Sequence, residues 1–266
     1  MTELTQSAVF EQRATVESWD RDYYHPIAAR YYDQAIAEML RLMEVPSSAR
    51  VLDAGCGPGI HSVRVARAGH PVVAIDISQT MLAEARVRMA AAGLGSSVEF
   101  EQQDLTNLSF ADESFRYVFS WGVIIHIHEV NRALDQLARI VEPGGKLALY
   151  VTNRAAWDHK LESLARLLLH KSLRQQRLRL GNGTWYEMHG QRLWVWQFDI
   201  PELERELARR GLTLTHRVIG EFSEIQRRLD GPLRRALLRW NNLCYRLKLS
   251  PVPAASNLLI FTKSRH

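Results

Sequence analysis

The chain has 266 residues, of which 46% are hydrophobic and 24% charged, and these values are typical of a globular protein with one large core. Its two cysteines, Cys56 and Cys244, form neither a disulfide framework nor a CxxC metal pair, which excludes a secreted disulfide scaffold. The N-terminal residues lack the basic start and apolar core of a signal peptide, and no run of 18 apolar residues could cross a membrane. We therefore expect a cytoplasmic protein.

The net charge of +5 hides a difference between two parts of the chain. Residues 1–152 hold 13 Lys and Arg against 19 Asp and Glu, whereas residues 153–266 hold 21 against 10. A basic region of this kind can contact nucleic acid, a phosphate-bearing substrate or an anionic membrane surface, or it can be a solvated face. The charge alone leaves these alternatives open.

Residues 1–50 are predicted to form an N-terminal helical cap. Pro46 and the serines after it end the predicted helix. Apolar residues recur in this segment at the three- and four-residue spacing of one helix face: Ile27, Tyr31, Ala35, Met39 and Leu42.

Strand-like and helix-like segments alternate over residues 51–152, which we assign as the cofactor-binding core. Short all-apolar runs here are typical of strands buried on both faces. This alternation predicts an α/β fold with a doubly wound, mostly parallel sheet, in which ligands bind beyond the carboxyl ends of the strands. The predicted strands are residues 50–54, 72–75, 97–101, 115–120 and 146–152, and the predicted helices are 60–68, 79–92 and 130–141.

The alternation breaks after residue 152. Residues 153–198 hold a basic helix-like stretch over 156–173 and then an aromatic-rich segment, and we assign them as a lid or substrate insertion. Residues 199–266 are assigned as the C-terminal part of the core, with a helix over 201–210, strands over 212–219 and 257–262, and a helical insertion over 220–255.

The most informative segment is the glycine-rich loop between the first predicted strand and helix, Val51-Leu-Asp-Ala-Gly-Cys-Gly-Pro-Gly-Ile. Its glycines allow a tight turn and a close approach of the backbone to a ligand. A dinucleotide site favours Gly-x-Gly-x-x-Gly, but Ile60 stands where the last glycine would be. Asp53, two residues before the first glycine, would repel a pyrophosphate and suits a cationic ligand.

Acids stand at the ends of the first three predicted strands: Asp53, Asp76 and Asp104. Asp76 can accept hydrogen bonds from both hydroxyls of a ribose, and Asp104 can accept one from an adenine amino group. Each acid alone is more often a loop or capping residue. Together with the glycine loop they favour S-adenosylmethionine, which carries a sulfonium and an ammonium group and no phosphate.

Four segments resemble the class I S-adenosylmethionine-dependent methyltransferases of the methyltransferase-11/UbiE/UbiG-like type: VLDAGCGPG, AIDIS, Gln-Asp-Leu at 103–105 and IVEPGGKLAL. The resemblance covers residues 30–152, with a weaker continuation at NLLIFTKS. It implies a Rossmann-like sheet of seven strands, the last of them antiparallel, with S-adenosyl-L-methionine as cofactor and S-adenosyl-L-homocysteine as product.

The resemblance also implies cofactor-binding residues. Against the methionine part of the cofactor would lie Asp53, Gly55, Cys56 and Gly57. The ribose would be held by Asp76 and Ile77, and the adenine would be framed by Asp104 and Leu105, with Met81 near it. The methyl-bearing sulfur would face Ser120 and Trp121, at the end of the fourth strand.

The candidate catalytic residue is His126. The family usually follows the fourth strand with a leucine-histidine run, and only His126 matches it, because Ile125 replaces the polar residue before it. A histidine can remove the proton of a hydroxyl acceptor near neutral pH. A packed histidine at a strand–helix junction is an equally favoured alternative, and no histidine–carboxylate cluster has metal-ligand spacing.

Aromatic residues suggest where the methyl acceptor binds. Trp185 and Trp194 belong to a cluster that could wall a pocket or form the core of a lid, and Tyr24 in the N-terminal segment is a third candidate. In the second insertion, arginines are interleaved with one apolar helix face: Leu229, Leu233, Leu237, Trp240, Cys244 and Leu247. Such a helix could lie on an anionic membrane, although docking on its own domain is favoured.

The sequence therefore predicts a methyltransferase that acts on a hydroxyl or amine of a small molecule, such as a secondary metabolite, quinone precursor or saccharide. One alternative is an RNA methyltransferase whose basic C-terminal half contacts phosphates, although no RNA-binding module is recognisable. Another is a non-catalytic, cofactor-binding subunit. The sequence does not identify the methyl acceptor or the oligomeric state. Besides a small-molecule acceptor and nucleic acid, an anionic membrane surface is the third partner that the sequence allows.

Overall fold

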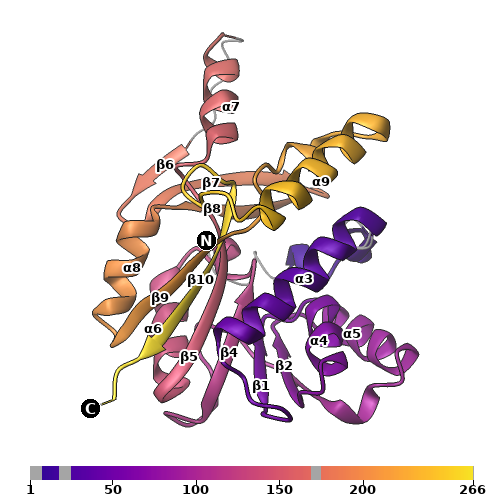
Figure 1. Ribbon diagram of the computed structural model, residues 1–266, viewed down its shortest axis with the longest axis vertical. Coiled ribbons are helices and arrows are strands. Elements are labelled where there is room, and N and C mark those ends of the chain that lie inside the picture. The colour runs from indigo at the N-terminus through magenta and orange to yellow at the C-terminus, as the bar shows by residue number, and fades with distance from the viewer. Residues whose placement is uncertain (1–7, 18–24, 169–174, 266) are drawn as a thin grey trace.

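The computed structural model describes residues 8–17, 25–168 and 175–265. Its centre is a seven-stranded sheet with the strand order β3-β2-β1-β4-β5-β10-β9 (Figure 1). β10 runs antiparallel to both of its neighbours, and the pairs from β3 to β5 are parallel. The strands are β1 (Val51–Ala54), β2 (Val72–Asp76), β3 (Val98–Gln102), β4 (Phe115–Trp121), β5 (Val141–Thr152), β9 (Leu212–Ile219) and β10 (Ser256–Lys263).

This architecture confirms the predicted doubly wound sheet with an antiparallel final strand. The chain runs outward from β1 to β2 and β3, then crosses back to β4 on the other side of β1. β1 and β4 therefore flank the switch point, where the loops beyond the strand ends diverge and leave room for a ligand.

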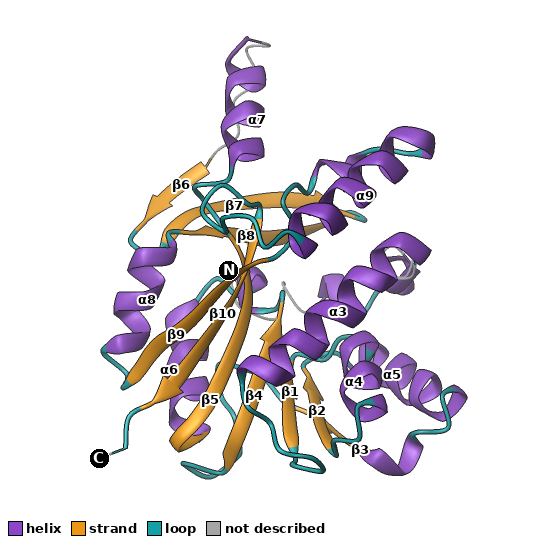
Figure 2. Cartoon of the chain, viewed as in Figure 1, coloured by secondary structure: helices purple, strands orange, loops and turns teal. Residues whose placement is uncertain are grey.

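Helices cover both faces of the sheet (Figure 2). Alternate strand residues point to opposite faces, so Leu52 and Val118 enter one hydrophobic cluster while Val51 and Phe119 enter the other. The first cluster includes α6 (Val130–Ile140) and α8 (Ile200–Ala208); the second includes α3 (Pro26–Leu42), α4 (Ile60–Arg67) and α5 (Gln79–Ala91).

Residues 175–198 form a second sheet that the sequence did not predict. After α7 (Trp157–Leu168), three antiparallel strands follow: β6 (Gln175–Leu178), β7 (Gly181–Met188) and β8 (Gln191–Phe198). His189 and Gly190, both with positive φ, make the two-residue turn between β7 and β8, a geometry that matches the twist of a hairpin. The indole of Trp194 lies across Gly183, where a larger residue would leave it no space.

The insertion over residues 220–255 contains a short helical turn, η3 (Ile225–Arg228), and α9 (Gly231–Arg246). The predicted docked face of α9 is wrong. Cys244 from that face is buried, but Leu233 and Trp240 are exposed. The helix instead buries Leu238 and the polar Asn241, whose amide exchanges hydrogen bonds of 3.0 and 2.8 Å with the backbone of Ser223. Because both the oxygen and the nitrogen of this amide have a hydrogen-bond partner, a polar residue can occupy the buried face.

No described helix is both long and apolar enough to span a bilayer.

Candidate active site

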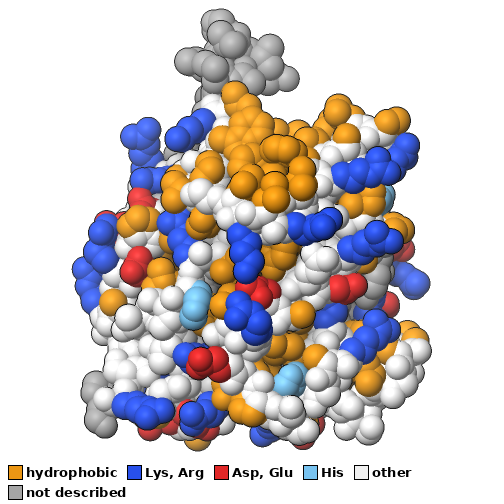
Figure 3. Space-filling model, viewed as in Figure 1, with side chains coloured by type: hydrophobic (Ala, Val, Ile, Leu, Met, Phe, Trp, Pro, Cys, Tyr) orange, Lys and Arg blue, Asp and Glu red, His pale blue; other side chains and the backbone are white. Residues whose placement is uncertain are grey.

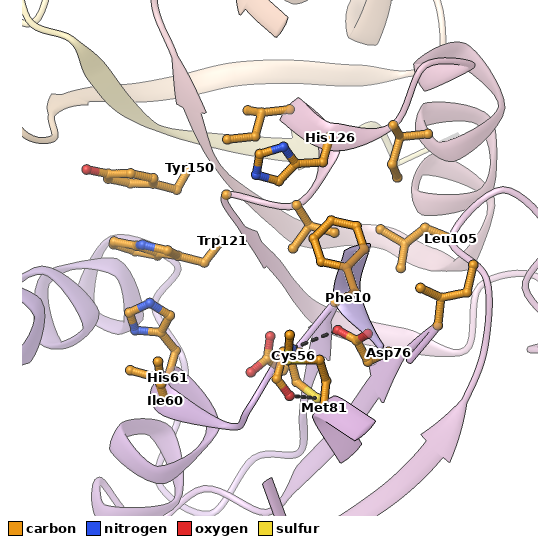
Figure 4. A pocket seen from close by; sticks show the side chains of 18 of the residues that line it. Phe10, Cys56, Ile60, His61, Asp76, Met81, Leu105, Trp121, His126 and Tyr150 are labelled. Carbon is orange, nitrogen blue, oxygen red and sulfur yellow. Dashed lines mark hydrogen bonds between the residues drawn. The ribbon is translucent and has the colours of Figure 1, made fainter. Parts of the chain in front are cut away.

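A cavity of about 300 Å³ opens at the carboxyl ends of β1, β2 and β4 (Figure 4). Asp76 lies at one end of it, with Cys56 and Met81, and His126 and Tyr150 lie at the other end. Asp53 also lines the cavity. The cavity therefore sits at the switch point of the sheet, where a doubly wound fold binds its ligand.

The glycine loop after β1 forms the floor of the cavity and is held against β2. The backbone N–H groups of Gly55 and Cys56 both donate to the carbonyl of Ile75 at 2.8 Å. Gly55 has a φ of +88°, and a Cβ there would overlap the side chain of Val123. A residue with a side chain would meet both a strained backbone and a steric clash at this position.

Asp53 and Asp76 are buried carboxyl groups with few neutralising partners. Asp53 accepts a hydrogen bond from the Ser62 hydroxyl at 2.6 Å. Burial, opposed by this bond and reinforced by the charge of Asp76, raises the pKa of Asp53 to about 7. Asp76 accepts from the N–H groups of Gly57 at 2.8 Å and Ser78 at 2.9 Å, and burial raises its pKa to about 6. A cationic ligand would restore the favourable interactions that burial removes.

Most of the other residues predicted to hold the cofactor also line the cavity. Asp104 is fixed at its edge by hydrogen bonds from the backbone N–H of Thr106 at 2.8 Å and from its hydroxyl at 2.9 Å. Ser120 is the exception, because it is buried within β4 and is not among the lining residues. The predicted residues that line the cavity are Asp53, Gly55, Cys56, Gly57, Asp76, Ile77, Met81, Asp104, Leu105 and Trp121.

His126 also lines the cavity, from the helical turn η2 (Ile124–His126) after β4. Its Nδ1 is 3.1 Å from the carbonyl oxygen of Trp194. A carbonyl can only accept, so Nδ1 carries the proton and Nε2 is the basic nitrogen. Burial lowers the pKa of His126 to about 4, the bond to Trp194 opposes this shift and the charge of Arg227 reinforces it. The imidazole is therefore neutral at physiological pH.

The two predicted substrate-binding tryptophans lie outside the cavity lining. Trp194 is fully buried among Trp196, Trp185 and His128, and it reaches the site only through its backbone carbonyl. Trp185 is half-buried and stacks on His128, with the ring centroids 5.8 Å apart. Tyr24 falls outside the described residues.

Several lining residues were not predicted from the sequence. Phe10 comes from the N-terminal segment: its carbonyl accepts a hydrogen bond from Ser78 at 2.9 Å, and its ring lies 5.9 Å from that of His126. Val195 comes from β8, and Glu224 and Arg227 come from the insertion before α9. None of these stands in a local motif, and only the tertiary fold brings them together.

The far end of the cavity has an aromatic and polar wall. The rings of Trp121 and Tyr150 stack at 4.2 Å, and the Tyr150 hydroxyl is within hydrogen-bond distance of Tyr31 at 3.0 Å and Ser256 at 2.6 Å. Arg227 donates to the buried carboxylate of Glu221 at 2.7 Å. Because these groups are held by partners, they form a rigid wall.

Among the described residues, no group of three or more His, Cys, Asp or Glu side chains is placed to hold a metal ion.

Residues 51–145 match the family model described as a methyltransferase domain. A ubiquinone biosynthesis O-methyltransferase from Xanthomonas axonopodis pv. citri (strain 306) is 33% identical over 129 residues, which cover 46% of this chain and 53% of that protein. The chain spans about half the length of the curated relatives it matches or less.

Solved structures share the fold at low sequence identity. Magnesium protoporphyrin IX methyltransferase (ChlM) from Synechocystis PCC 6803, solved with bound S-adenosylhomocysteine, has a TM-score of 0.65 at 17% identity, covering 99% of this chain and 100% of that one. The cyclase SpnF has a TM-score of 0.58 at 18% identity, covering 88% and 82%. Because one fold serves a methyltransferase and a cyclase, these likenesses show the fold alone.

The sheet order, the glycine loop and the family match identify residues 51–145 as a class I S-adenosylmethionine-dependent methyltransferase domain. The cofactor of this class fits the cavity, since the buried acids Asp53 and Asp76 suit a ligand that carries positive charge and a ribose and lacks a phosphate.

Proposed function

We propose that this protein transfers a methyl group from S-adenosylmethionine to a hydroxyl or amine of a small molecule. The observation that carries the proposal is that one cavity joins the buried acids Asp53 and Asp76, at the glycine loop, to the basic nitrogen of His126. The relative from Xanthomonas is named an O-methyltransferase, which supports an oxygen acceptor.

The division of the cavity supports this assignment of roles. The end with Asp53 and Asp76 would hold the cofactor, through charge and hydrogen bonds to the ribose. When bound, the cofactor supplies a methyl group already activated by the sulfonium. The chain then has to align the acceptor with that methyl group and to exclude water. The apolar side chains of Phe10 and Val123, which line the cavity, favour the exclusion of water.

His126 would position the acceptor and take its proton. Its protonated Nδ1 is anchored on the Trp194 carbonyl, so Nε2 can accept a hydrogen bond from an acceptor hydroxyl. As the acceptor oxygen bonds to the methyl carbon, the carbon–sulfur bond breaks and the hydroxyl proton must leave. Because its pKa is low, His126 is a weak base until the acceptor oxygen begins to bond to the methyl carbon. Its contribution to orienting the hydroxyl would therefore be larger than its contribution to removing the proton.

The acceptor would occupy the far end of the cavity. Val195 from β8 and Arg227 from η3 reach this end, so both insertions contribute to it. This placement supports the view that residues 153–198 and 220–255 determine the substrate, while residues 51–152 hold the cofactor.

Both cysteines are buried free thiols, which is consistent with the cytoplasm as the site of action.

The experiment is a methyl-transfer assay with S-adenosylmethionine labelled on its methyl group. The protein is incubated with a cell extract that contains both small molecules and RNA, and label is followed into each fraction in parallel with the His126→Gln and Asp76→Ala variants. The proposal predicts labelled small molecules with the native protein and fewer of them with either His126→Gln or Asp76→Ala. Label that appears in RNA, or cofactor binding without labelled product from any extract, would contradict it.

A further inference from the structure

The surface of α9 divides into three faces of different chemistry. One face, with Leu238 and Asn241, is buried against the protein, and the Asn242 amide donates to the Ile27 carbonyl of α3 at 3.0 Å. A second face is apolar and exposed, and we call it the apolar stripe. Its residues, with their exposed fractions, are Leu233 (58%), Trp240 (44%), Leu243 (43%) and Leu247 (62%).

The third face of α9 is basic and exposed. It carries Arg235, Arg239 and Arg246, which follow one another at helical spacing beside the apolar stripe, and we call it the basic flank. α9 contains no Asp or Glu. Within the described part of the chain, none of the three arginines forms an ion pair with an acidic side chain.

The apolar stripe continues onto neighbouring elements. Trp240 meets the ring of Phe222, with the centroids 6.1 Å apart, and Phe222 in turn meets Trp157 of α7 at 6.0 Å. Val252 and Leu161 are exposed by 54% and 47%. Figure 3 shows hydrophobic side chains gathered on the upper part of this face, with basic side chains at its edge over α9. A patch of this kind, rimmed by charge, marks an interaction surface.

We propose that α9 docks the protein on the surface of an anionic lipid bilayer. An interfacial helix buries an apolar face that includes Trp and Leu at the boundary between headgroups and acyl chains, while arginines beside it contact acidic headgroups. The apolar stripe and the basic flank of α9 have this arrangement. Docking does not require that the cavity perform methyl transfer.

The charge of α9 argues against the other occupants of this surface. If the stripes of two copies paired, two arginine-rich helices that themselves carry no acid would approach each other, and this repulsion opposes a dimer. RNA would use the arginines but would leave the apolar stripe in water. An anionic bilayer is the partner that satisfies both faces at once.

Docking would also orient the cavity. Arg227, at its far end, lies in η3, four residues before the first residue of α9. The end assigned above to the acceptor is therefore close in the chain to the docking helix, so a membrane-borne acceptor could enter from the bilayer side. This last consequence rests on the proposed function, whereas docking itself does not.

The experiment is sedimentation of the full chain with vesicles of phosphatidylcholine, with and without phosphatidylglycerol, at two salt concentrations. Two variants test the surface: Trp240→Gln/Leu243→Gln/Leu247→Gln for the apolar stripe and Arg235→Gln/Arg239→Gln/Arg246→Gln for the basic flank. Matched controls are Val87→Gln, at an exposed apolar residue of α5, and Arg50→Gln/Arg132→Gln/Arg205→Gln, at exposed arginines elsewhere. Thermal unfolding and size-exclusion chromatography check that every variant is folded and monitor its oligomeric state.

The proposal predicts binding to the anionic vesicles only, weakened by salt. The basic-flank variant should bind about 100-fold more weakly at low salt, and the apolar-stripe variant about 10-fold more weakly, while both controls bind like the native protein. Absence of binding to anionic vesicles, or equal binding by all variants, would overturn it. So would a change of oligomeric state in the apolar-stripe variant, or RNA binding that the basic-flank variant alone loses.

Discussion

Asp76 accepts a hydrogen bond from the backbone N–H of Gly57 at 2.8 Å, and this bond ties the end of β2 to the glycine loop that follows β1. The two features that the sequence presents 19 residues apart are thus one structural unit. Since the same carboxylate would receive the ribose hydroxyls, cofactor binding and loop geometry depend on each other.

The raised pKa values of the two acids predict a pH-dependent affinity for the cofactor. A positively charged ligand favours the ionised carboxylates, so the affinity for S-adenosylmethionine should rise as the pH increases from about 5.5 to 8, through the values near 6 for Asp76 and near 7 for Asp53. Calorimetric titrations across this range measure the change. Asp53→Asn should flatten the upper part of the profile, whereas a flat profile for the native protein would contradict the prediction.

The same pKa values predict how the stability of the ligand-free protein changes with pH. The folded state holds the protons of Asp53 and Asp76 more tightly than the unfolded state does, so their contribution to the free energy of unfolding falls as the pH rises from about 4 to 7. Urea unfolding at several pH values, with and without Asp53→Asn, isolates this contribution. A native-to-variant difference that is constant with pH would show that Asp53 is not perturbed.

Gly55→Ala should abolish tight cofactor binding and destabilise the protein by about 2 kcal/mol, because the φ of +88° is strained for alanine and its Cβ would overlap Val123. Gly69→Ala is the matched control, since Gly69 has a φ of +89° and no heavy atom near its virtual Cβ. The control should lose stability but keep its affinity for the cofactor. Calorimetry and thermal unfolding distinguish the two effects, and equal affinities in the two variants would exclude a special role for Gly55.

His126→Gln should lower the rate of methyl transfer about 100-fold and leave the affinity for the cofactor unchanged. Because burial lowers the pKa of His126 to about 4, protonation of this residue should not reduce the rate between pH 6 and 8. Rate profiles of the native and variant enzymes over this range provide the measurement. A small effect of the substitution would instead support a purely packed histidine.

The core of the fold was predictable because its signals are local. The alternating strands and helices of residues 51–152, the glycine loop and the acids at the strand ends each lie within a short segment, and a parallel sheet brings strand ends together at one edge. The antiparallel β10 was predicted from the resemblance and is confirmed.

The insertions were predicted less well because their structure depends on distant contacts. The hairpin of β7 and β8 turns at His189-Gly190, a signal that is weaker than Asn-Gly, and its tryptophan rings pack against one another. On α9, hydrophobicity suggested the wrong docked face because Asn241 is buried by pairing with Ser223, which no helix-face pattern reveals. Arg227 reaches the cavity only through this tertiary arrangement.

Calorimetric titration of S-adenosylmethionine into the native protein and into Asp76→Ala tests whether the buried acid holds the cofactor, with Asp112→Ala, at an exposed acid on the surface, as the control. We expect one site per chain, an affinity at least about 10-fold weaker in Asp76→Ala, and an unchanged affinity in Asp112→Ala. No binding to the native protein, or equal affinity in all three proteins, would contradict this expectation.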